Sequence, residues 1–471
     1  MSATTDWSLA PASEIAGAVS AGTVAAREVV AAALERIARL DPAVNSVTDR
    51  LVERATARAA SLDAARARGD ALGPLAGVPF AVKNLFDVAG LPTRAGSRIN
   101  RERAAATRDA ALIERLEAAG AVLVGTLGMG EYAYDFTGEN IHDGNTRNPH
   151  ARGHMSGGSS GGSGAAVAAG LVPIALASDT NGSIRVPAAF CGCFGLKPTY
   201  GRLSRAGSFP FVGSLDHLGP MARSSRDLAL AYDAMQGPDP EDPALAPHPA
   251  EPAAPDLDRG VADLRIAVAG EYFARGGDPE AFAAVAHVAR ALGAHRSVAI
   301  PEAARARAAA YLITAAEGAA LHLDRLRSRA GDFDPAVRDR LIAGAMLPAP
   351  FVEQAQRFRR WYRDAVLALF REVDVILVPS TPVRAPRAGQ TTFVLDGVEL
   401  PVRPNIGVFT QPISFIGLPV AAVPVWLDGG LPLGVQVIAA PWNEALCLRV
   451  ARHLEREGAV RAPVATLDET R

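Results

Sequence analysis

Two serine-bearing segments and one lysine are the residues of this sequence best suited to nucleophilic chemistry. Ser159 lies in a glycine- and serine-rich run at 157–164, and Ser183 follows within Asp-Thr-Asn-Gly-Ser-Ile-Arg at 179–185. A serine hydroxyl is a weak nucleophile until a neighbouring group takes its proton. Lys83 ends an apolar segment, where burial would lower its pKa and leave a neutral amine. The three residues together predict a serine nucleophile with a lysine as its base.

The scarcity of lysine supports a special role for this residue type. Of the 48 basic residues only Lys83 and Lys197 are lysine, which leaves 46 arginines. A buried lysine can lose its proton, whereas arginine effectively cannot. We therefore expect lysine where a guanidinium would not serve, with chance survival on the surface as the alternative. For Lys197, a buried ion pair and a catalytic duty both stay open.

The turn at 179–185 offers a second catalytic element. Consecutive backbone N–H groups at Thr180, Asn181, Gly182 and Ser183 can converge on one oxyanion. None of the histidines has a companion pattern that marks it as the base, so the lysine keeps that role.

The run at 157–164 has three other interpretations. A flexible linker would join blocks of different composition, but this run leads directly into an apolar helix and strand. A phosphate-binding loop would need the lysine of GxxxxGK[ST], which is missing. The G-x-S-x-G pattern at 157–161 matches a nucleophile elbow, but no apolar strand precedes it. Although that lysine is missing, a nucleotide- or phosphate-binding module built on the glycine-rich run is the non-enzyme alternative.

Composition excludes several classes of protein. The 471 residues are 49% hydrophobic and 21% charged, which is typical of a folded globular chain. A net charge of −2 creates no positive electrostatic field that would attract nucleic acid or an anionic membrane surface. Cys191, Cys193 and Cys447 cannot form a disulfide framework, and no second ligand pair completes a metal site. With no signal peptide or membrane-spanning pattern, we expect a cytoplasmic protein.

The pattern of elements predicts an α/β fold. Buried strands are expected where short apolar runs recur, at 77–83, 121–125, 172–178, 264–270, 373–379, 418–425 and 433–439. Helices are expected at 109–120 and 443–458, and residues 1–70 should form a helical segment packed on the core. Residues 71–236 would hold the site, and 258–471 would complete the same domain. The intervening 237–257, with seven prolines, would cross the surface.

The motifs at 157–204 and 81–88 resemble those of the amidase signature family, and the resemblance covers nearly the whole chain. It implies hydrolysis of amide bonds by a Ser–cis-Ser–Lys triad, with no metal or organic cofactor. By position, Ser183 would be the nucleophile that forms an acyl-enzyme, Ser159 the bridging serine and Lys83 the base. The four amides named above would form the oxyanion hole. The implied fold is a single large α/β domain, a mixed β-sheet covered by helices on both faces.

Segments 179–187 (DTNGSIRVP) and 230–240 (LAYDAMQGPDP) are similar to one subgroup, the 1-carboxybiuret hydrolases of cyanuric acid degradation. That similarity implies cleavage of the terminal amide of a small carboxylated biuret, releasing ammonia and urea-1,3-dicarboxylate. It also implies a small helical partner subunit resembling the amidotransferase C subunit, while a homodimer stays open. Asn181 departs from the family pattern, which has glycine there. The enzymatic alternatives are a glutaminase-like A subunit of a tRNA-dependent amidotransferase and an amidase of other small amides.

A small anionic substrate would need cations in its pocket. Arg327 and Arg403 are candidates because a guanidinium matches a carboxylate as a fork. The alternative for each is an ordinary solvated arginine. Tyr132 and Gln411 are candidates for orienting the substrate amide, and the Asn181 side chain, beside the oxyanion hole, is a candidate for a further polar contact to the substrate.

Overall fold

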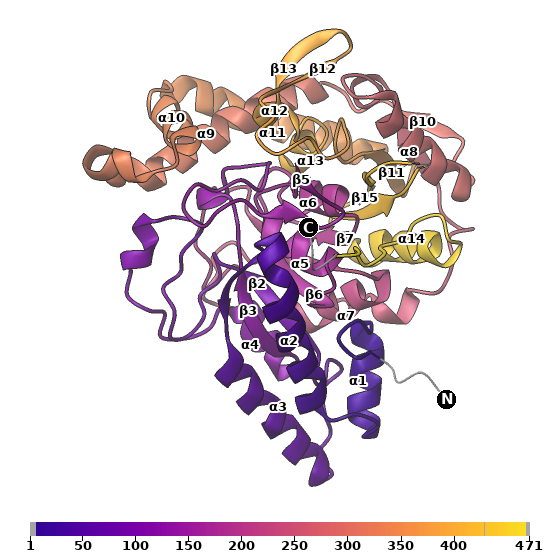
Figure 1. Cartoon of the computed structure of the whole chain (residues 1–471). Coiled ribbons are helices and arrows are strands. Elements are labelled where there is room, and N and C mark those ends of the chain that lie inside the picture. The colour runs from indigo at the N-terminus through magenta and orange to yellow at the C-terminus, as the bar shows by residue number, and fades with distance from the viewer. Residues whose placement is uncertain (1–5, 428, 468–471) are drawn as a thin grey trace.

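An 11-stranded mixed β-sheet forms the centre of the molecule in the computed structural model, which describes residues 6–427 and 429–467 (Figure 1). Its order is β1-β3-β2-β6-β8-β7-β14-β15-β11-β9-β10. The strands are β1 Val47–Arg50, β2 Pro79–Lys83, β3 Val122–Leu127, β6 Ile174–Asp179, β7 Phe194–Lys197, β8 His217–Ala222, β9 Ile266–Ala269, β10 Arg296–Val298, β11 Val375–Pro379, β14 Val420–Val425 and β15 Leu433–Ala439. Two small hairpins lie outside it, β4 Arg147–Asn148 with β5 Ala151–Met155 and β12 Thr392–Leu395 with β13 Val398–Pro401.

Helices cover both faces of this sheet, which confirms the predicted fold class. The helices are α1 Ala12–Ala21, α2 Ala26–Val44, α3 Val52–Ala67, α4 Ala111–Ala118, α5 Gly161–Ala168, α6 Arg185–Cys191, α7 Ser225–Met235, α8 Pro279–Ala291, α9 Ala303–Arg329, α10 Pro335–Ala345, α11 Ala349–Leu369, α12 Val402–Asn405, α13 Gln411–Ser414 and α14 Glu444–Arg456. Neighbouring α4, α7 and α14 pack on one face, and α5 and α6 pack on the other. The central strands are therefore buried throughout and mainly apolar, with polar residues such as Lys83 and Asp179 at strand ends.

All seven predicted strands form, with ends within two residues of the predicted bounds, as β2, β3, β6, β9, β11, β14 and β15. The two predicted helices form as α4 and α14, and α1 to α3 lie within 1–70 beside the short edge strand β1. Two central strands, β7 and β8, were not predicted. β7 has four residues, and β8 contains Gly219 and Pro220, residue types that strands usually exclude.

The proline-rich segment connects strands of one sheet. Residues 237–253 contain no helix or strand, and a single 3₁₀ turn follows at Ala254–Asp256. Strands from both sides of this segment, such as β8 before it and β9 after it, belong to the same sheet. The proposed division of the chain at 237–257 stays a prediction. Among the described residues, no helix is long and apolar enough to cross a membrane.

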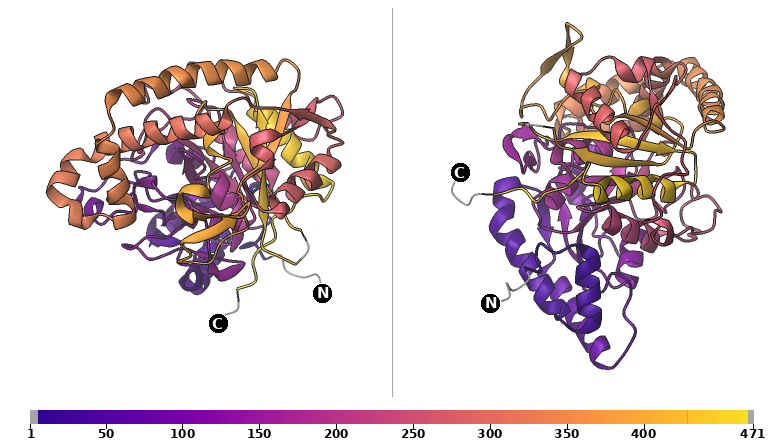
Figure 2. Two further views of the ribbon diagram at one scale, coloured as in Figure 1. Left: turned by 90° about the horizontal axis from the view of Figure 1, so that it is seen from above. Right: turned by 90° about the vertical axis from the view of Figure 1, so that its right-hand side faces the viewer.

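The long helices α9, α10 and α11 form an outer layer beyond the sheet (Figure 2). Both α10 and α11 pack against α9. Sequence analysis did not predict these helices, although α9 and α10 supply side chains to the site described below.

Candidate active site

Lys83 is the last residue of the buried strand β2, and its amine lies among three serine hydroxyls. Its Nζ is 2.7 Å from Ser159 Oγ, 2.9 Å from Ser160 Oγ and 2.8 Å from Ser178 Oγ. Ser159 and Ser160 directly precede α5, and Ser178 lies in β6, the parallel neighbour of β2. The lysine is 0% exposed, which confirms its predicted burial.

Burial governs the charge of this amine. Desolvation lowers the pKa of Lys83 to about 7, while the carboxylates of Asp179, Asp216 and Asp135 act in the opposite direction. No carboxylate is hydrogen-bonded to Nζ among the described residues. The neutral amine is therefore well populated near neutral pH.

The backbone before Ser159 is closely packed. The peptide bond between Gly158 and Ser159 is cis. A Cβ atom at Gly158 would lie 2.5 Å from Asp135 Oδ2 and 2.9 Å from the Gly138 nitrogen. Only glycine fits at this position, which explains the glycine that precedes the serine in the motif.

A buried ion pair holds the turn that carries Ser183. Arg185 donates from Nε to Asp179 Oδ2 and from Nη2 to Asp179 Oδ1, each at 2.9 Å, and both side chains are fully buried. Burial raises the pKa of Asp179, but the charge and hydrogen bonds of Arg185 outweigh this and keep the pKa well below its usual range. Because Asp179 ends β6 and Lys83 ends β2, the turn and the amine lie at the same edge of the sheet.

Three of the four predicted oxyanion amides are free. The N–H groups of Thr180, Asn181 and Ser183 have no acceptor within residues 6–427 and 429–467. Gly182 is a correction, because its N–H donates to Asp179 Oδ1 at 2.7 Å and so is already occupied. The Asp179 carboxylate, which holds the turn, accepts the Gly182 N–H, so this group is not available to an oxyanion.

Ser183 lines a narrow cavity between the turn and helices α9, α10 and α13, here called the Ser183 cavity. Its polar lining includes Thr180, Asn181, Ser183, Thr314, Arg340 and Gln411, and Asp135 forms part of its wall. Asn181 donates from Nδ2 to Thr314 Oγ1 at 2.8 Å, and its buried Oδ1 has no hydrogen-bond partner among the described residues. Two of the predicted substrate-binding residues, Asn181 and Gln411, are thus brought together beside Ser183.

The other predicted substrate-binding residues do not line this cavity. Arg403 pairs with Asp135 Oδ1 at 2.5 Å and Glu139 Oε2 at 2.8 Å, so two carboxylates already occupy its guanidinium. The Arg327 side chain is 71% exposed on the outer face of α9 and lies 3.6 Å from Asp324.

Tyr132 is buried outside the cavity lining, with its ring 4.0 Å from that of His322. Its hydroxyl donates to Asn100 Oδ1 at 3.4 Å. Both contacts fix it within the protein core.

Lys197 makes no ion pair with any described residue, so the ion-pair interpretation is wrong. Its Nζ donates to the Leu418 carbonyl at 2.5 Å and the Pro198 carbonyl at 3.1 Å. Burial lowers its pKa to about 7, and the charge of Arg185 acts in the same direction. These contacts tie the end of β7 to the segment that leads into β14.

Arg340 of α10 is a residue of the cavity wall that sequence analysis missed. Its guanidinium carbon lies 3.9 Å from the centroid of the Tyr134 ring, and Nη2 donates to the Tyr134 carbonyl. Its Nε donates to the Ala336 carbonyl at 2.8 Å. In the described part of the chain no carboxylate pairs with it. Among 46 arginines it carries no distinguishing local pattern, and only the packing of α10 places it in the wall of the Ser183 cavity.

The fold and the lysine–serine cluster can now be compared with those of known proteins, and the matches define the class of this protein, an α/β enzyme that hydrolyses amide bonds. A family model described as Amidase matches residues 28–448, and the chain belongs to that family.

Curated relatives and solved structures agree with this assignment. The chain is 54% identical to AtzE of Pseudomonas sp. strain ADP, named as a component of 1-carboxybiuret hydrolase, over 95% of this chain and 98% of that protein. It is 38% identical to the A subunit of the glutamyl-tRNA(Gln) amidotransferase of Chromohalobacter salexigens, over 94% of this chain and 95% of that protein. A solved structure described as a vestigial protein complex that reveals the evolutionary origins of an s-triazine catabolic enzyme matches with a TM-score of 0.94 and 53% identity, over 98% of this chain and 100% of that chain.

Proposed function

We propose that this amidase hydrolyses the terminal amide of 1-carboxybiuret, giving urea-1,3-dicarboxylate and ammonia. The observation that carries the proposal is the fully buried Lys83 amine within hydrogen-bond distance of Ser159, at the sheet edge that also carries the Ser183 turn. The 54% identity to a component of 1-carboxybiuret hydrolase supports the choice of substrate.

In the proposed mechanism, neutral Lys83 accepts a proton from Ser159 as Ser159 accepts one from Ser183, and Ser183 Oγ attacks the amide carbon. The free amides of Thr180, Asn181 and Ser183 would hold the oxyanion, each strong donor contributing about 3 kcal/mol. The relay then returns the proton to the leaving nitrogen, and ammonia departs from the acyl-enzyme. Water repeats the sequence, releasing the carboxylate product and free Ser183.

We assign recognition of the substrate carboxylate to Arg340, because it is a guanidinium in the cavity wall without a carboxylate partner among the described residues. The unpartnered Asn181 Oδ1 would accept an N–H of the substrate. Gln411 Oε1 already accepts from Arg307 Nε at 3.0 Å, which leaves its amide N–H groups for a substrate carbonyl.

Arg340→Met should selectively weaken hydrolysis of the carboxylated substrate. Loss of hydrogen bonds to a charged group costs about 1.5–3 kcal/mol, so we expect kcat/KM for 1-carboxybiuret to fall by about 10- to 150-fold. Hydrolysis of uncharged biuret should change by less than about two-fold. The matched control is Arg327→Met, which removes an exposed guanidinium from α9. Equal losses on both substrates would contradict the assignment of Arg340.

Activity should rise with pH through about 7. Protonated Lys83 cannot accept the Ser159 proton, and burial lowers its pKa to about 7. Below that pH, kcat/KM should fall about ten-fold for each pH unit, and above it a plateau is expected. The measurement is ammonia release in constant-ionic-strength buffers from pH 5 to 9. A plateau that extends down to pH 5 would show that the base is not this lysine.

We further propose that the chain works in the cytoplasm with a small helical partner protein. The match to a solved structure described as a complex supports a partner, and the three buried free cysteines fit a reducing compartment. Mild purification of the tagged chain from its source organism should recover a second, much smaller polypeptide. A fully active chain that purifies alone would contradict the proposal.

An ammonia-release assay over 1-carboxybiuret, biuret, allophanate, glutamine and simple amides tests the substrate directly. We expect the highest kcat/KM for 1-carboxybiuret. A preference for glutamine, increased by tRNA-binding partners, would favour the function named for the relatives that are 38% identical.

A further inference from the structure

We propose that Ser160 and Ser178 are positioning residues that hold the two protons of neutral Lys83, so that the nitrogen lone pair faces Ser159. This inference rests on the proposed function, because it concerns how the same base is aimed. A neutral amine has two N–H donors and one lone pair, whereas three hydroxyls surround Nζ at 2.7–2.9 Å. Catalysis needs the lone pair on Ser159, so the other two hydroxyls must act as acceptors.

The contacts of Ser160 fix it as an acceptor toward the lysine. Its Oγ donates to the Ser178 carbonyl at 3.1 Å and accepts the Ser178 N–H at 3.3 Å. A hydroxyl has one proton, and Ser160 has already directed that proton to the carbonyl. The 2.9 Å contact with Lys83 must therefore be a hydrogen bond from Nζ to Ser160.

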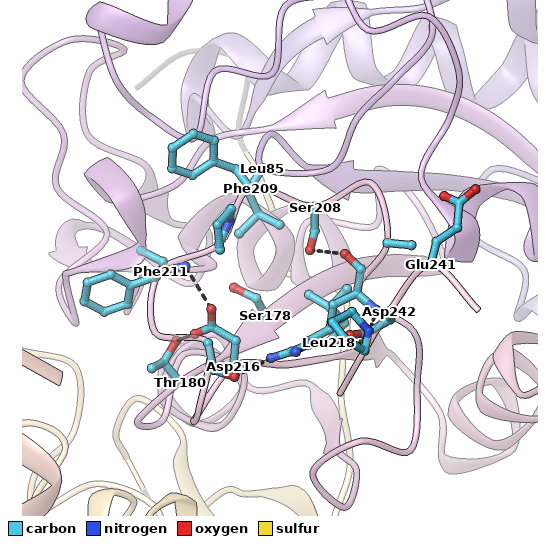
Figure 3. Close-up of a pocket in the computed structure, with 16 residues that line it drawn as sticks. Leu85, Ser178, Thr180, Ser208, Phe209, Phe211, Asp216, Leu218, Glu241 and Asp242 are labelled. Carbon is cyan, nitrogen blue, oxygen red and sulfur yellow. Dashed lines mark hydrogen bonds and ion pairs between the residues drawn. The ribbon is translucent and has the colours of Figure 1, made fainter. Parts of the chain in front are cut away.

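The Ser178 hydroxyl can point its own hydrogen away from Lys83. Its side chain projects from β6 into a second cavity of about 180 Å³, here called the Ser178 cavity, which is large enough for water (Figure 3). The wall includes Arg205, Asp216 and Asp242, and no protein acceptor for the Ser178 hydroxyl lies in the described ranges. With its proton directed into this cavity, Ser178 Oγ accepts the second N–H of Lys83.

Ser159 is the remaining partner. Its Oγ lies 2.7 Å from Nζ, a distance that suits a hydrogen bond in either direction. With both amine protons held elsewhere, the Ser159 hydroxyl donates to the lone pair. The lone pair of Lys83 Nζ then faces the Ser159 hydroxyl before substrate binds.

Ser178→Ala should lower the plateau kcat by about 10- to 100-fold with KM changed less than two-fold, because the amine can then turn a proton toward Ser159. The acid limb of the pH profile should move to lower pH, because protonated Lys83 loses one of its three acceptors. The carboxylates that face the amine, Asp179, Asp216 and Asp135, stay in place. Ser178→Thr, which keeps the hydroxyl and has the cavity to receive its methyl group, should restore kcat to within about three-fold.

Two controls separate positioning from structural damage. Ser208 lines the same cavity but donates to the Arg205 carbonyl at 2.7 Å, so Ser208→Ala should behave as wild type. If Ser178→Ala does not fold, Ser160→Ala removes the other acceptor and should give the same two changes. An acid limb that moves to higher pH would indicate water entering around the lysine and would overturn the inference. So would wild-type kinetics in Ser178→Ala, or a Ser178→Thr variant as impaired as the alanine variant.

The outcome is distinguishable from failure of the proposed function. If Lys83→Arg is inactive while Ser178→Ala is unchanged, the lysine is the base and the positioning role alone is wrong. If Lys83→Arg retains wild-type ammonia release, the proposed mechanism fails whatever Ser178 does.

Discussion

Ser183→Ala should reduce ammonia release from 1-carboxybiuret by about 10⁴- to 10⁶-fold, the scale seen when a serine nucleophile is removed. The variant keeps the backbone amides of the turn and the Asp179–Arg185 ion pair, so it should fold and still bind substrate. Ser183 makes no side-chain hydrogen bond to another described residue, so little native structure depends on its hydroxyl. The measurement is the single-turnover rate with enzyme in excess, combined with the dissociation constant of the substrate.

The matched control for this variant is Ser163→Ala. Ser163 is a buried serine on α5 whose Oγ donates to the Leu176 carbonyl at 2.9 Å, with no hydrogen bond to Lys83. It should lose some stability and little activity. Intact-mass measurement of rapidly quenched wild-type enzyme should show the acyl adduct, which Ser183→Ala should lack. Turnover by Ser183→Ala within ten-fold of wild type would show that the nucleophile lies elsewhere.

Lys83→Arg should be inactive, with kcat reduced by at least about 10³-fold, although it keeps the positive charge. A guanidinium does not release its proton at any pH the protein survives, so it cannot serve as general base. Among the described residues, the surroundings of Lys83 present three hydroxyls and no carboxylate hydrogen bond, so a permanent charge there is poorly compensated.

Because a buried guanidinium can destabilise the fold, Lys83→Met provides the second test. Methionine replaces the amine by an uncharged chain of similar length, and it should be equally inactive while unfolding cooperatively near the wild-type temperature. Wild-type-like ammonia release by either variant would overturn the role of Lys83 as base.

Local sequence was sufficient to predict that Lys83 is buried at the end of a strand, and the structure places its amine beside Ser159. The catalytic roles of Lys83, Ser159 and Ser183 stay predictions. Lys83 ends an apolar run, and the glycine-rich segments around Ser159 and Ser183 are close-packed turns whose requirement for glycine is visible in the sequence. The strands that carry them are short apolar runs, a pattern that predicts buried strands when helices cover both faces.

Long-range pairing was not predictable in the same way. Arg403 was a reasonable choice for a substrate carboxylate, but its partner Asp135 lies 268 residues away in the chain. Nothing local marks that pair, nor does a local pattern distinguish Arg340 from the other arginines. The Gly182 amide was misassigned for a different reason. Its acceptor, the Asp179 carboxylate, is close in the chain, but the hydrogen bond forms only because of the conformation of the turn.

The charge of the Lys83 amine is the central claim, and titration by NMR measures it directly. Lysine labelled with ¹³C at Cε would give only two resonances, from Lys83 and Lys197, and Lys83→Met assigns them. The resonance of Lys83 should titrate near pH 7, together with the acid limb of kcat/KM. A Lys83 resonance that titrates near pH 10, while the enzyme is fully active at pH 8, would contradict a neutral lysine base.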